Sequence, residues 1–456
     1  MKENKMGILP VNQLLISMAV PMMLSMLIQA LYNIVDSMFV AQISENALTA
    51  VSLAFPFQNL LISVGVGTGV GVNSLLSRLL GEQNREEVGK TAMNALFLAL
   101  CGFLIFALIG TACVRPFFEI QTDVPEIVES GVSYMSICTI FSAGVMASTM
   151  CEKLLAATGK TVLTMVTQLS GALINIILDP IMIFGLFGFP AMGVAGAAAA
   201  TVIGQSVGGI LGIWLNHSKN PEIVMHWRRF RPDFRLIHRI YSVGLPAIIM
   251  QSVGSVMTFG MNLILIPFTT TAAAVFGIYF KLQSFVFMPL FGMNNAMVPI
   301  VAYNYGARKP DRIRGVFKWG LLYGLLIMTA GFLIFEFAPG LLLQIFAASE
   351  NMLRIGIPAL RIIALTFIPA AFGIVASGVF QATGHGMFSL WQSLIRQLVV
   401  LLPCAWLFSF TGNLDVVWLA FPISEIISAT FSFFCLKWIF KHQVDPLDHP
   451  SAAASA

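Results

Sequence analysis

Long apolar stretches, interrupted by short polar segments, recur along nearly the whole chain. A helix needs roughly 20 predominantly apolar residues to cross the hydrocarbon of a bilayer. The pattern therefore predicts twelve membrane-spanning helices rather than strands. We expect them near residues 13–41, 47–77, 91–114, 131–155, 161–187, 192–215, 236–266, 272–303, 315–339, 355–381, 386–410 and 415–440.

Composition supports an all-α integral membrane protein. The 456 residues are 57% hydrophobic and only 10% charged, with a mean hydropathy of +0.86. One soluble core cannot hide that much apolar surface, so lipid must be the solvent for most of it. The first apolar stretch has the length of a full span and lacks a short core followed by a cleavage site, so we expect it to remain as the first helix.

The charges of the loops predict the orientation. When the loops are numbered alternately, 20 of the 25 Lys and Arg fall on one side, which the positive-inside rule makes cytoplasmic together with both termini. The net charge of +4 is spread over six such segments rather than gathered on one face, so we expect no nucleic-acid partner. The basic residues of that side are Lys2, Lys5, Arg78, Arg85, Lys90, Lys153, Lys160, Lys219, Arg228, Arg229, Arg231, Arg235, Arg239, Arg308, Lys309, Arg312, Arg314, Lys318, Lys437 and Lys441.

The chain contains an internal repeat with an offset of 225 residues. Pro21 falls on Pro246, and the string AATG after the fourth span falls on QATG after the tenth. Two six-helix lobes with the same orientation, related by pseudo-two-fold symmetry about the membrane normal, are the expected result. We predict an N-lobe at 1–216, a cytoplasmic linker at 217–235, a C-lobe at 236–441 and a cytoplasmic tail at 442–456.

Cysteine and histidine spacing gives no sign of an enzyme or a metal centre. The six cysteines have no CxxC spacing, and the six histidines form no HExxH motif and lie outside the spans or at their edges. We expect no catalytic residues and no cofactor. The terminal string SAAASA is low-complexity and carries no functional signal.

Several polar residues lie inside predicted spans, where ionisable groups are costly and are therefore candidates for function. Asp36 lies in the outer part of the first span, one turn after Tyr32. Asn175 and Asp179 are four residues apart in the fifth span and so share a face. Thr201 lies at a similar depth in the sixth. Two carboxylates, an amide and a hydroxyl at one level can hold a hard cation or share a proton, although they can also be hydrogen-bonded packing residues.

Specific strings in this chain resemble the multidrug and toxic compound extrusion (MATE) family. They are ALYNIVDSMFV, the glycine run of the second span ending in SRLLGEQN, NIILDPIMIF, and GIYFKLQSFVFMP followed by NNAMVPIVAYNYGAR, the last two being similar to a MepA-like branch. The resemblance covers essentially the whole chain. It implies a cation-coupled antiporter that extrudes varied, often cationic and amphipathic compounds. It also implies that Asp36, Asn175, Asp179 and Thr201 form the N-lobe cation site, with Na⁺ as the candidate metal ion and H⁺ as the alternative.

The C-lobe departs from another branch of the family, the NorM-like one, which has acids in the seventh and tenth helices. Gln251 and an acid-free tenth helix stand there in this chain, whereas Lys281, Arg396 and Glu425 lie near the predicted bilayer midplane. Charges at that depth must pair or face water. Glu425 can form a structural ion pair with Lys281 or Arg396, or one of the two cations can face the cavity and influence substrate choice.

We interpret a further set of polar residues as lining the substrate cavity. The set is Tyr32, Asn33, Gln29, Gln58, Gln251, Lys281, Gln283, Arg396 and Glu425. Pairing between helices is an equally valid interpretation for the glutamines.

The expected function is cation-coupled (H⁺ or Na⁺) multidrug efflux by alternating access in the inner, cytoplasmic membrane. The expected partners are drug-like small molecules and membrane lipid, with a single chain as the working unit. The alternative is a flippase for lipid-linked oligosaccharides of the same superfamily. An intramembrane enzyme or receptor would need a nucleophile, a metal cluster or a large soluble domain, and the sequence shows no convincing one.

Overall fold

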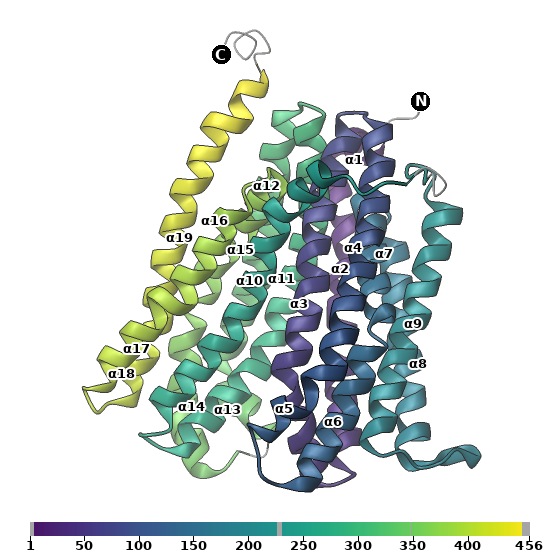
Figure 1. The fold of residues 1–456 in the computed structure, drawn as a ribbon. Helices are drawn as coiled ribbons and strands as arrows, with labels where there is room; N and C mark the ends of the chain where they lie inside the picture. Colours follow the sequence, from purple (N-terminus) through teal and green to yellow (C-terminus); the bar gives the residue numbers. More distant parts are fainter. Residues whose placement is uncertain (1–3, 226–229, 347, 449–456) are drawn as a thin grey trace. The chain divides into compact units, whose positions relative to one another are not determined.

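The computed structural model describes residues 4–225, 230–346 and 348–448, and within these ranges it contains helices and no strand (Figure 1). In the described part of the chain, ten helices are long and apolar enough to cross a membrane, and two bent helix pairs bring the number of candidate spans to twelve if each pair is one span. The predicted all-helical membrane fold is thereby confirmed. His226, Arg228 and Arg229 of the predicted linker, together with Lys2, His449 and the SAAASA string, lie outside the described residues.

The chain divides into two compact units, and both divisions fall inside helices. The N-terminal unit is Leu24–Ile248, and the C-terminal unit combines Met1–Met23 with Ile249–Ala456. Helix α2 (Val11–Ala41) and helix α10 (Phe234–Leu265) each contribute one part to each unit.

The N-terminal unit is built from the second part of α2, the first part of α10 and the helices between them. These are α3 (Glu45–Gly81), α4 (Arg85–Ala112), α5 (Val114–Glu119), α6 (Pro125–Ile140), α7 (Ala143–Ala157), α8 (Thr161–Phe184), the 3₁₀ turn η1 (Leu186–Gly188) and α9 (Val194–Lys219).

The C-terminal unit contains α1 (Lys5–Ile8), the remaining parts of α2 and α10, and all later helices. These are α11 (Thr270–Gly306), α12 (Pro310–Phe337), α13 (Pro339–Gln344), α14 (Glu350–Ala364), α15 (Phe367–Ala382), α16 (Gly386–Leu394), the π-helical turn η3 (Ile395–Val399), α17 (Leu401–Ser409), α18 (Leu414–Trp418), α19 (Ala420–Ile439), the π-helical turn η4 (Phe440–Val444) and the 3₁₀ turn η5 (Asp445–Asp448).

The 225-residue repeat recurs in the backbone of the two units. Gln83 and Arg308, which are 225 residues apart, both adopt positive φ angles, of 59° and 54°. The pair α6 and α7 is bent by 49° and the pair α14 and α15 by 47°. Corresponding sequences therefore end and bend their helices at corresponding positions.

Side-chain contacts repeat with the same offset. The Thr164 hydroxyl donates to the backbone oxygen of Glu152 over 3.3 Å, and the Ser389 hydroxyl donates to that of Ser377 over 3.1 Å. Both contacts join the two helices that flank the TG turn in their own unit. The repeat is thus present in tertiary contacts as well as in sequence.

Small residues set the spacing between α8 and α9. A Cβ atom added at Gly204 would lie 2.6 Å from the backbone oxygen of Gly171 and 3.1 Å from Cβ of Asn175. Small residues at helix interfaces in membranes allow this kind of backbone approach. The approach brings the polar face of α8 against α9.

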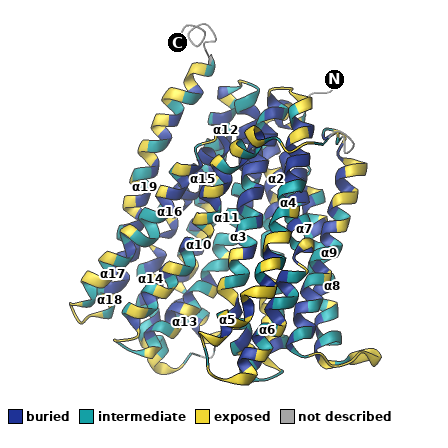
Figure 2. Ribbon diagram, viewed as in Figure 1, coloured by how far each residue is buried: buried dark blue, intermediate teal, exposed yellow. Residues whose placement is uncertain are grey.

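Large apolar side chains are abundant on the outside of the helices. Leu108 is 70% exposed and Ile210 68% exposed, and many other large apolar residues are exposed too. Exposed positions recur along the helices, in yellow in Figure 2. A soluble monomer rarely exposes contiguous apolar surface on this scale. Lipid contact explains it, because acyl chains solvate leucine and isoleucine without cost.

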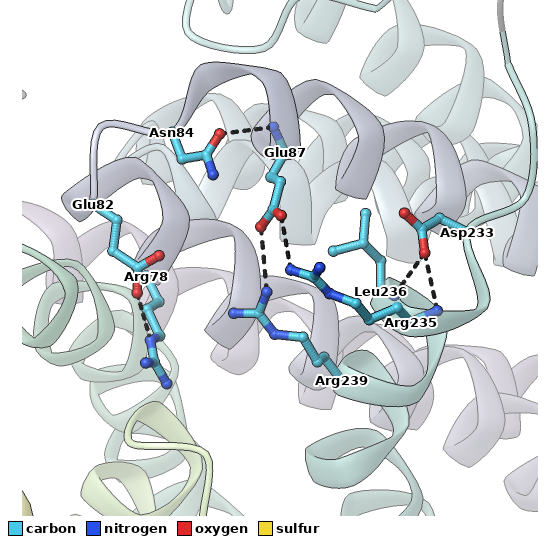
Figure 3. Close-up of polar contacts among 8 residues, drawn as sticks. All are labelled: Arg78, Glu82, Asn84, Glu87, Asp233, Arg235, Leu236 and Arg239. Carbon is cyan, nitrogen blue, oxygen red and sulfur yellow. Dashed lines mark hydrogen bonds and ion pairs between the residues drawn. The ribbon is translucent and has the colours of Figure 1, made fainter. Parts of the chain in front are cut away.

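Charged contacts tie the beginning of α10 to the beginning of α4 (Figure 3). The Glu87 carboxylate accepts from Arg235 over 3.1 Å and from Arg239 over 3.3 Å. Asn84 caps α4 by accepting from the Glu87 amide, and Asp233 accepts from the Arg235 amide at the start of α10.

One basic residue of the predicted cytoplasmic side is buried. Lys153, counted above with the charges of the cytoplasmic side, lies within α7 and is only 8% exposed. Its aliphatic stem packs against Gly69 of α3, where a Cβ atom would meet Lys153 Cγ at 2.7 Å. Packing of the long apolar stem explains why this cation tolerates the interior.

Candidate functional site

Three helices of the N-terminal unit place polar side chains at one level. Asp36 comes from α2, Asn175 and Asp179 from α8, and Thr201 from α9. Asp179 is 0% exposed, and Asn175 and Thr201 are also buried. The carboxyl groups of Asp36 and Asp179 lie within interaction distance of each other. The structure thus brings together the four residues that the sequence nominated for the cation site.

The amide of Asn175 links the other members of this cluster. In the orientation that satisfies both of its ends, its nitrogen donates to Asp179 Oδ2 over 3.2 Å. Its oxygen then accepts from the Thr201 hydroxyl over 3.2 Å and from the Thr201 backbone amide over 3.1 Å. Asn175 therefore links the Asp179 carboxylate to Thr201 of α9 and so holds the carboxylate in place.

One acceptor in the cluster has no partner. Oδ1 of Asp36 is buried and accepts no hydrogen bond among the described residues. Burying a carboxylate oxygen without a hydrogen-bond donor is unfavourable, because the hydration that it loses is not replaced. A proton or a cation at this point would remove that cost and would also screen the neighbouring Asp179 carboxylate.

Aromatic and sulfur side chains that the sequence did not nominate adjoin the cluster. Tyr134 and Cys138 of α6 are buried and lie near Asp36. Two residues that the sequence did nominate for the cavity are also here: Gln58 of α3 lies beside the Tyr134 hydroxyl, and Tyr32 lies beside Asp36 and Asp179. The available signal was the i, i+4 spacing of Tyr134 and Cys138 on one face of the helix.

A third intramembrane carboxylate of the N-terminal unit, Glu152, was also missed by the sequence analysis. Glu152 of α7 accepts from the Ser148 hydroxyl over 3.1 Å and from the Gln168 amide over 2.8 Å. Oε1 of Gln168 is buried without a partner among the described residues. An acid inside the fourth predicted span was the signal that should have nominated it.

Other nominated residues are not part of this cluster. Gln29 and Asn33 of α2 and Gln251 of α10 are exposed, and Gln283 of α11 is half-buried. In the C-terminal unit, Glu425 pairs with Arg396 at 4.0 Å. Lys281 is exposed, and its ammonium lies 5.9 Å from the centre of the Phe346 ring.

Each unit contains a sizeable cavity. One of about 870 Å³ lies between α10 and α17 and is lined by apolar residues such as Leu263, Leu402 and Trp406. Another, of about 1540 Å³, lies where the start of α4 meets the segment before α10, with Lys90 and Arg231 in its wall. None of the nominated cavity residues lines either one.

Comparisons with known proteins agree with the repeat. The MatE family model matches residues 21–181 and 246–407, two segments whose starts have the 225-residue offset. The chain is 26% identical to the multidrug export protein MepA of Staphylococcus haemolyticus over 417 residues, which is 91% of each chain. It is 24% identical to an FAD transporter of Shewanella oneidensis over 436 residues, covering 93% of this chain and 94% of the relative.

Solved structures are similar over nearly their full length. An outward-facing multidrug resistance MATE transporter of the MOP superfamily superposes with a TM-score of 0.91 at 25% identity, covering 98% of this chain and 99% of its own. A MOP-superfamily transporter from Pyrococcus furiosus, described as having a binding pocket of reversed polarity, gives a TM-score of 0.90 at 25% identity and the same coverage. With its two copies of the MatE family model and its membrane-spanning helices, this chain belongs to the MATE family of multi-pass membrane transporters.

Proposed function

We propose that the protein is a multidrug efflux antiporter, in which a cation moving inward through the N-terminal acid cluster drives export of amphipathic compounds. The observation that carries this proposal is the pairing of Asp36 with Asp179, in which one buried oxygen of Asp36 has no partner. Family membership and the multidrug exporters among the relatives support the export of drug-like substrates.

The coupling follows from electrostatics. Two neighbouring carboxylates repel each other when both are ionised, and a proton or cation between them removes the repulsion. The conformation of α2 that holds Asp36 near Asp179 is therefore favoured when the cluster is loaded. A ligand shifts such an equilibrium only by its difference in affinity for the two states, and here the difference depends on whether Asp36 is in reach.

Hydrogen bonding in the cluster favours a proton as the coupling ion. A hard metal ion needs several oxygen ligands, and the Asn175 oxygen is already used by Thr201. A Na⁺ ion would require the amide to turn away from Thr201. No cofactor beyond the coupling ion enters the proposal.

The loop charges support a cytoplasmic-membrane protein with both termini inside the cell. One chain carries both copies of the repeat, which supports a monomer as the working unit. The predicted N-lobe at 1–216 and C-lobe at 236–441 remain proposals for the moving bodies.

The decisive experiment measures ethidium uptake into inside-out vesicles under separately imposed H⁺ and Na⁺ gradients. Wild type is compared with Asp36→Asn and Asp179→Asn, and Asp123→Asn in the exposed segment between α5 and α6 is the matched control. We expect uptake driven by the H⁺ gradient, lost in both cluster variants and kept in the control.

Unchanged gradient-driven uptake in Asp36→Asn would overturn the role of the cluster. If the wild type takes up no dye under either gradient, a different class of transported substrate is favoured. The FAD transporter among the relatives makes flavin nucleotides the second candidate, ahead of lipid-linked oligosaccharides.

A further inference from the structure

The C-terminal unit contains an ion pair inside its helices. Arg396 lies in η3, the π-helical turn between α16 and α17, and Glu425 lies in α19. The closest atoms of the pair, Arg396 Nη1 and Glu425 Oε2, are 4.0 Å apart. That distance exceeds hydrogen-bond length, so the two charges attract each other without a hydrogen bond.

Both partners have hydrogen-bonding groups that the ion pair does not use. Glu425 is 6% exposed, and its Oε1 is buried with no hydrogen-bond partner among the described residues. Arg396 offers five N–H donors, and Glu425 is its only ion-pair partner within the described chain. The exposed pair Arg115 and Glu129 shows the alternative, with two parallel hydrogen bonds of 2.8 and 3.1 Å. A buried pair without such bonds does not recover its cost of desolvation.

The backbone around Arg396 departs from a regular α-helix. Residues Ile395–Val399 form a π-helical turn, a local widening that is uncommon and frequently found at functional sites. Gln397 of this turn donates to the Ser393 hydroxyl over 2.8 Å. This side-chain hydrogen bond links the turn to α16 without involving Arg396.

Space beside the Glu425 carboxylate depends on a glycine. A Cβ atom at Gly373 of α15 would lie 2.6 Å from Nε2 of Gln392 and 3.8 Å from Oε1 of Glu425. Any larger residue would clash with the Gln392 amide. The glycine therefore lets the Gln392 amide approach α15 closely beside the acid, although Oε1 of Glu425 accepts no hydrogen bond within the described chain.

Charge and exposure indicate which partner a ligand would meet. Within the described chain, Arg396 and the Tyr279 hydroxyl are the titratable groups that face Glu425, whereas Lys281 lies over Phe346. The Arg396 side chain is 24% exposed and that of Glu425 only 7%. An incoming molecule therefore reaches the guanidinium first, and its matching group is an anion.

We propose that Arg396 receives an oxyanion group, carboxylate or phosphate, of a transported substrate, and that Glu425 is the internal anion that this group displaces. The inference rests on the proposed transport function and names a substrate class for it. A planar guanidinium that lacks bidentate hydrogen bonds is suited to an incoming oxyanion, because carboxylate and phosphate match its fork.

Binding to purified protein in detergent tests the proposal without any ion gradient. The probes are two fluorescent pairs that differ in one anionic group: rhodamine 110 against its methyl ester rhodamine 123, and FMN against riboflavin. In wild type we expect the anionic member of at least one pair to bind about tenfold more tightly, the factor expected of one charge-assisted contact.

Three variants test whether Arg396 and Glu425 cause that preference for the anionic probe. Arg396→Met should abolish it, and Glu425→Gln should strengthen binding of the anionic probe, because the competing carboxylate is gone. The double variant Arg396→Met/Glu425→Gln buries no lone charge and should behave as Arg396→Met, which excludes misfolding as the cause. Arg361→Met is the control, since Arg361 is another arginine of this unit with a loose acid partner, Glu336, at 3.9 Å.

Equal binding of both members of both pairs by wild type, or no binding of any probe, would overturn the inference. A preference that survives in Arg396→Met, or weaker anion binding in Glu425→Gln, would also overturn it. Failure of the proposed function has a different signature, because gradient-driven dye uptake would be absent while the preference for anions at Arg396 persisted.

Discussion

The Gln168 side-chain amide donates to the Glu152 carboxylate over 2.8 Å and joins α8 to α7 in the N-terminal unit. The Ser148 hydroxyl donates to the other oxygen of the same carboxylate over 3.1 Å. This polar contact lies on the helix that also carries Asn175 and Asp179. Its loss should therefore affect the scaffold of the acid cluster.

Replacing Gln168 by leucine removes a donor to an acid and should lower the free energy of unfolding by about 1 to 3 kcal/mol. Thermal unfolding in detergent measures the change. A double-mutant cycle with Glu152→Gln isolates the pair, and a coupling energy near zero would show that the two side chains act independently.

The glycine contact between α8 and α9 predicts a steric effect. A valine at Gly204 would contact the backbone oxygen of Gly171 and Cβ of Asn175, so α8 must move away from α9. We expect lower thermal stability, and in vesicles a loss of dye uptake, because Asn175 no longer reaches Thr201. Gly277→Ala in α11 is the matched control, since nothing lies within 4 Å of the added Cβ atom. Wild-type uptake by Gly204→Val would contradict the prediction.

One contact pair of a small and a large residue occurs in both repeats, with the small residue on opposite helices of the pair. Gly69 faces Lys153 in the N-terminal unit, and the corresponding positions in the C-terminal unit hold Asn294 and Gly378. Gly69→Asn alone should be destabilising, because its side chain collides with the stem of Lys153.

Adding Lys153→Gly to Gly69→Asn copies the pair of the other repeat and should recover part of the lost stability. The recovery is limited by the cost of a helical glycine, about 1 kcal/mol. Unfolding midpoints of the single and double variants provide the measurement. Strictly additive losses would mean that the two positions are not in contact.

The Glu87 contacts predict a small, salt-dependent effect. Arg235 is largely exposed and Arg239 partly so, and exposed ion pairs contribute roughly 0 to 1 kcal/mol. Glu87→Gln should lower the unfolding midpoint slightly at low salt and less at high salt. Glu86→Gln, beside it on α4, is the control. A loss well above 1 kcal/mol would show that Glu87 does more than join α4 to α10.

Hydropathy alone was sufficient to predict the membrane-spanning helices. Each span is a local property of about 20 residues, because the bilayer demands apolar side chains and satisfied backbone groups within one segment. The repeat was also visible, because duplicated sequences keep their turn residues. Gly159 and Gly384 both adopt left-handed φ angles, of 82° and 87°, in their TG turns.

Proximity within the candidate site was predicted only in part. Depth along each helix placed Asp36, Asp179 and Thr201 at one level, and resemblance to the family supplied their grouping. Which helix faces actually meet depends on packing, so the sequence missed Tyr134, Cys138 and Glu152. It also left the partner of Glu425 undecided between Lys281 and Arg396.

The amino-acid sequence by itself determined the solvent of this protein, the number and length of its candidate spans and the duplication of its helices, because these depend on local hydropathy and on turn residues. Only the tertiary structure decided that the Asn175 oxygen accepts from Thr201 while its nitrogen donates to Asp179. The same holds for the 4.0 Å that separate Arg396 from Glu425. Such contacts are set by the rotation and approach of neighbouring helices, which glycines such as Gly204 and Gly373 permit but no single segment encodes.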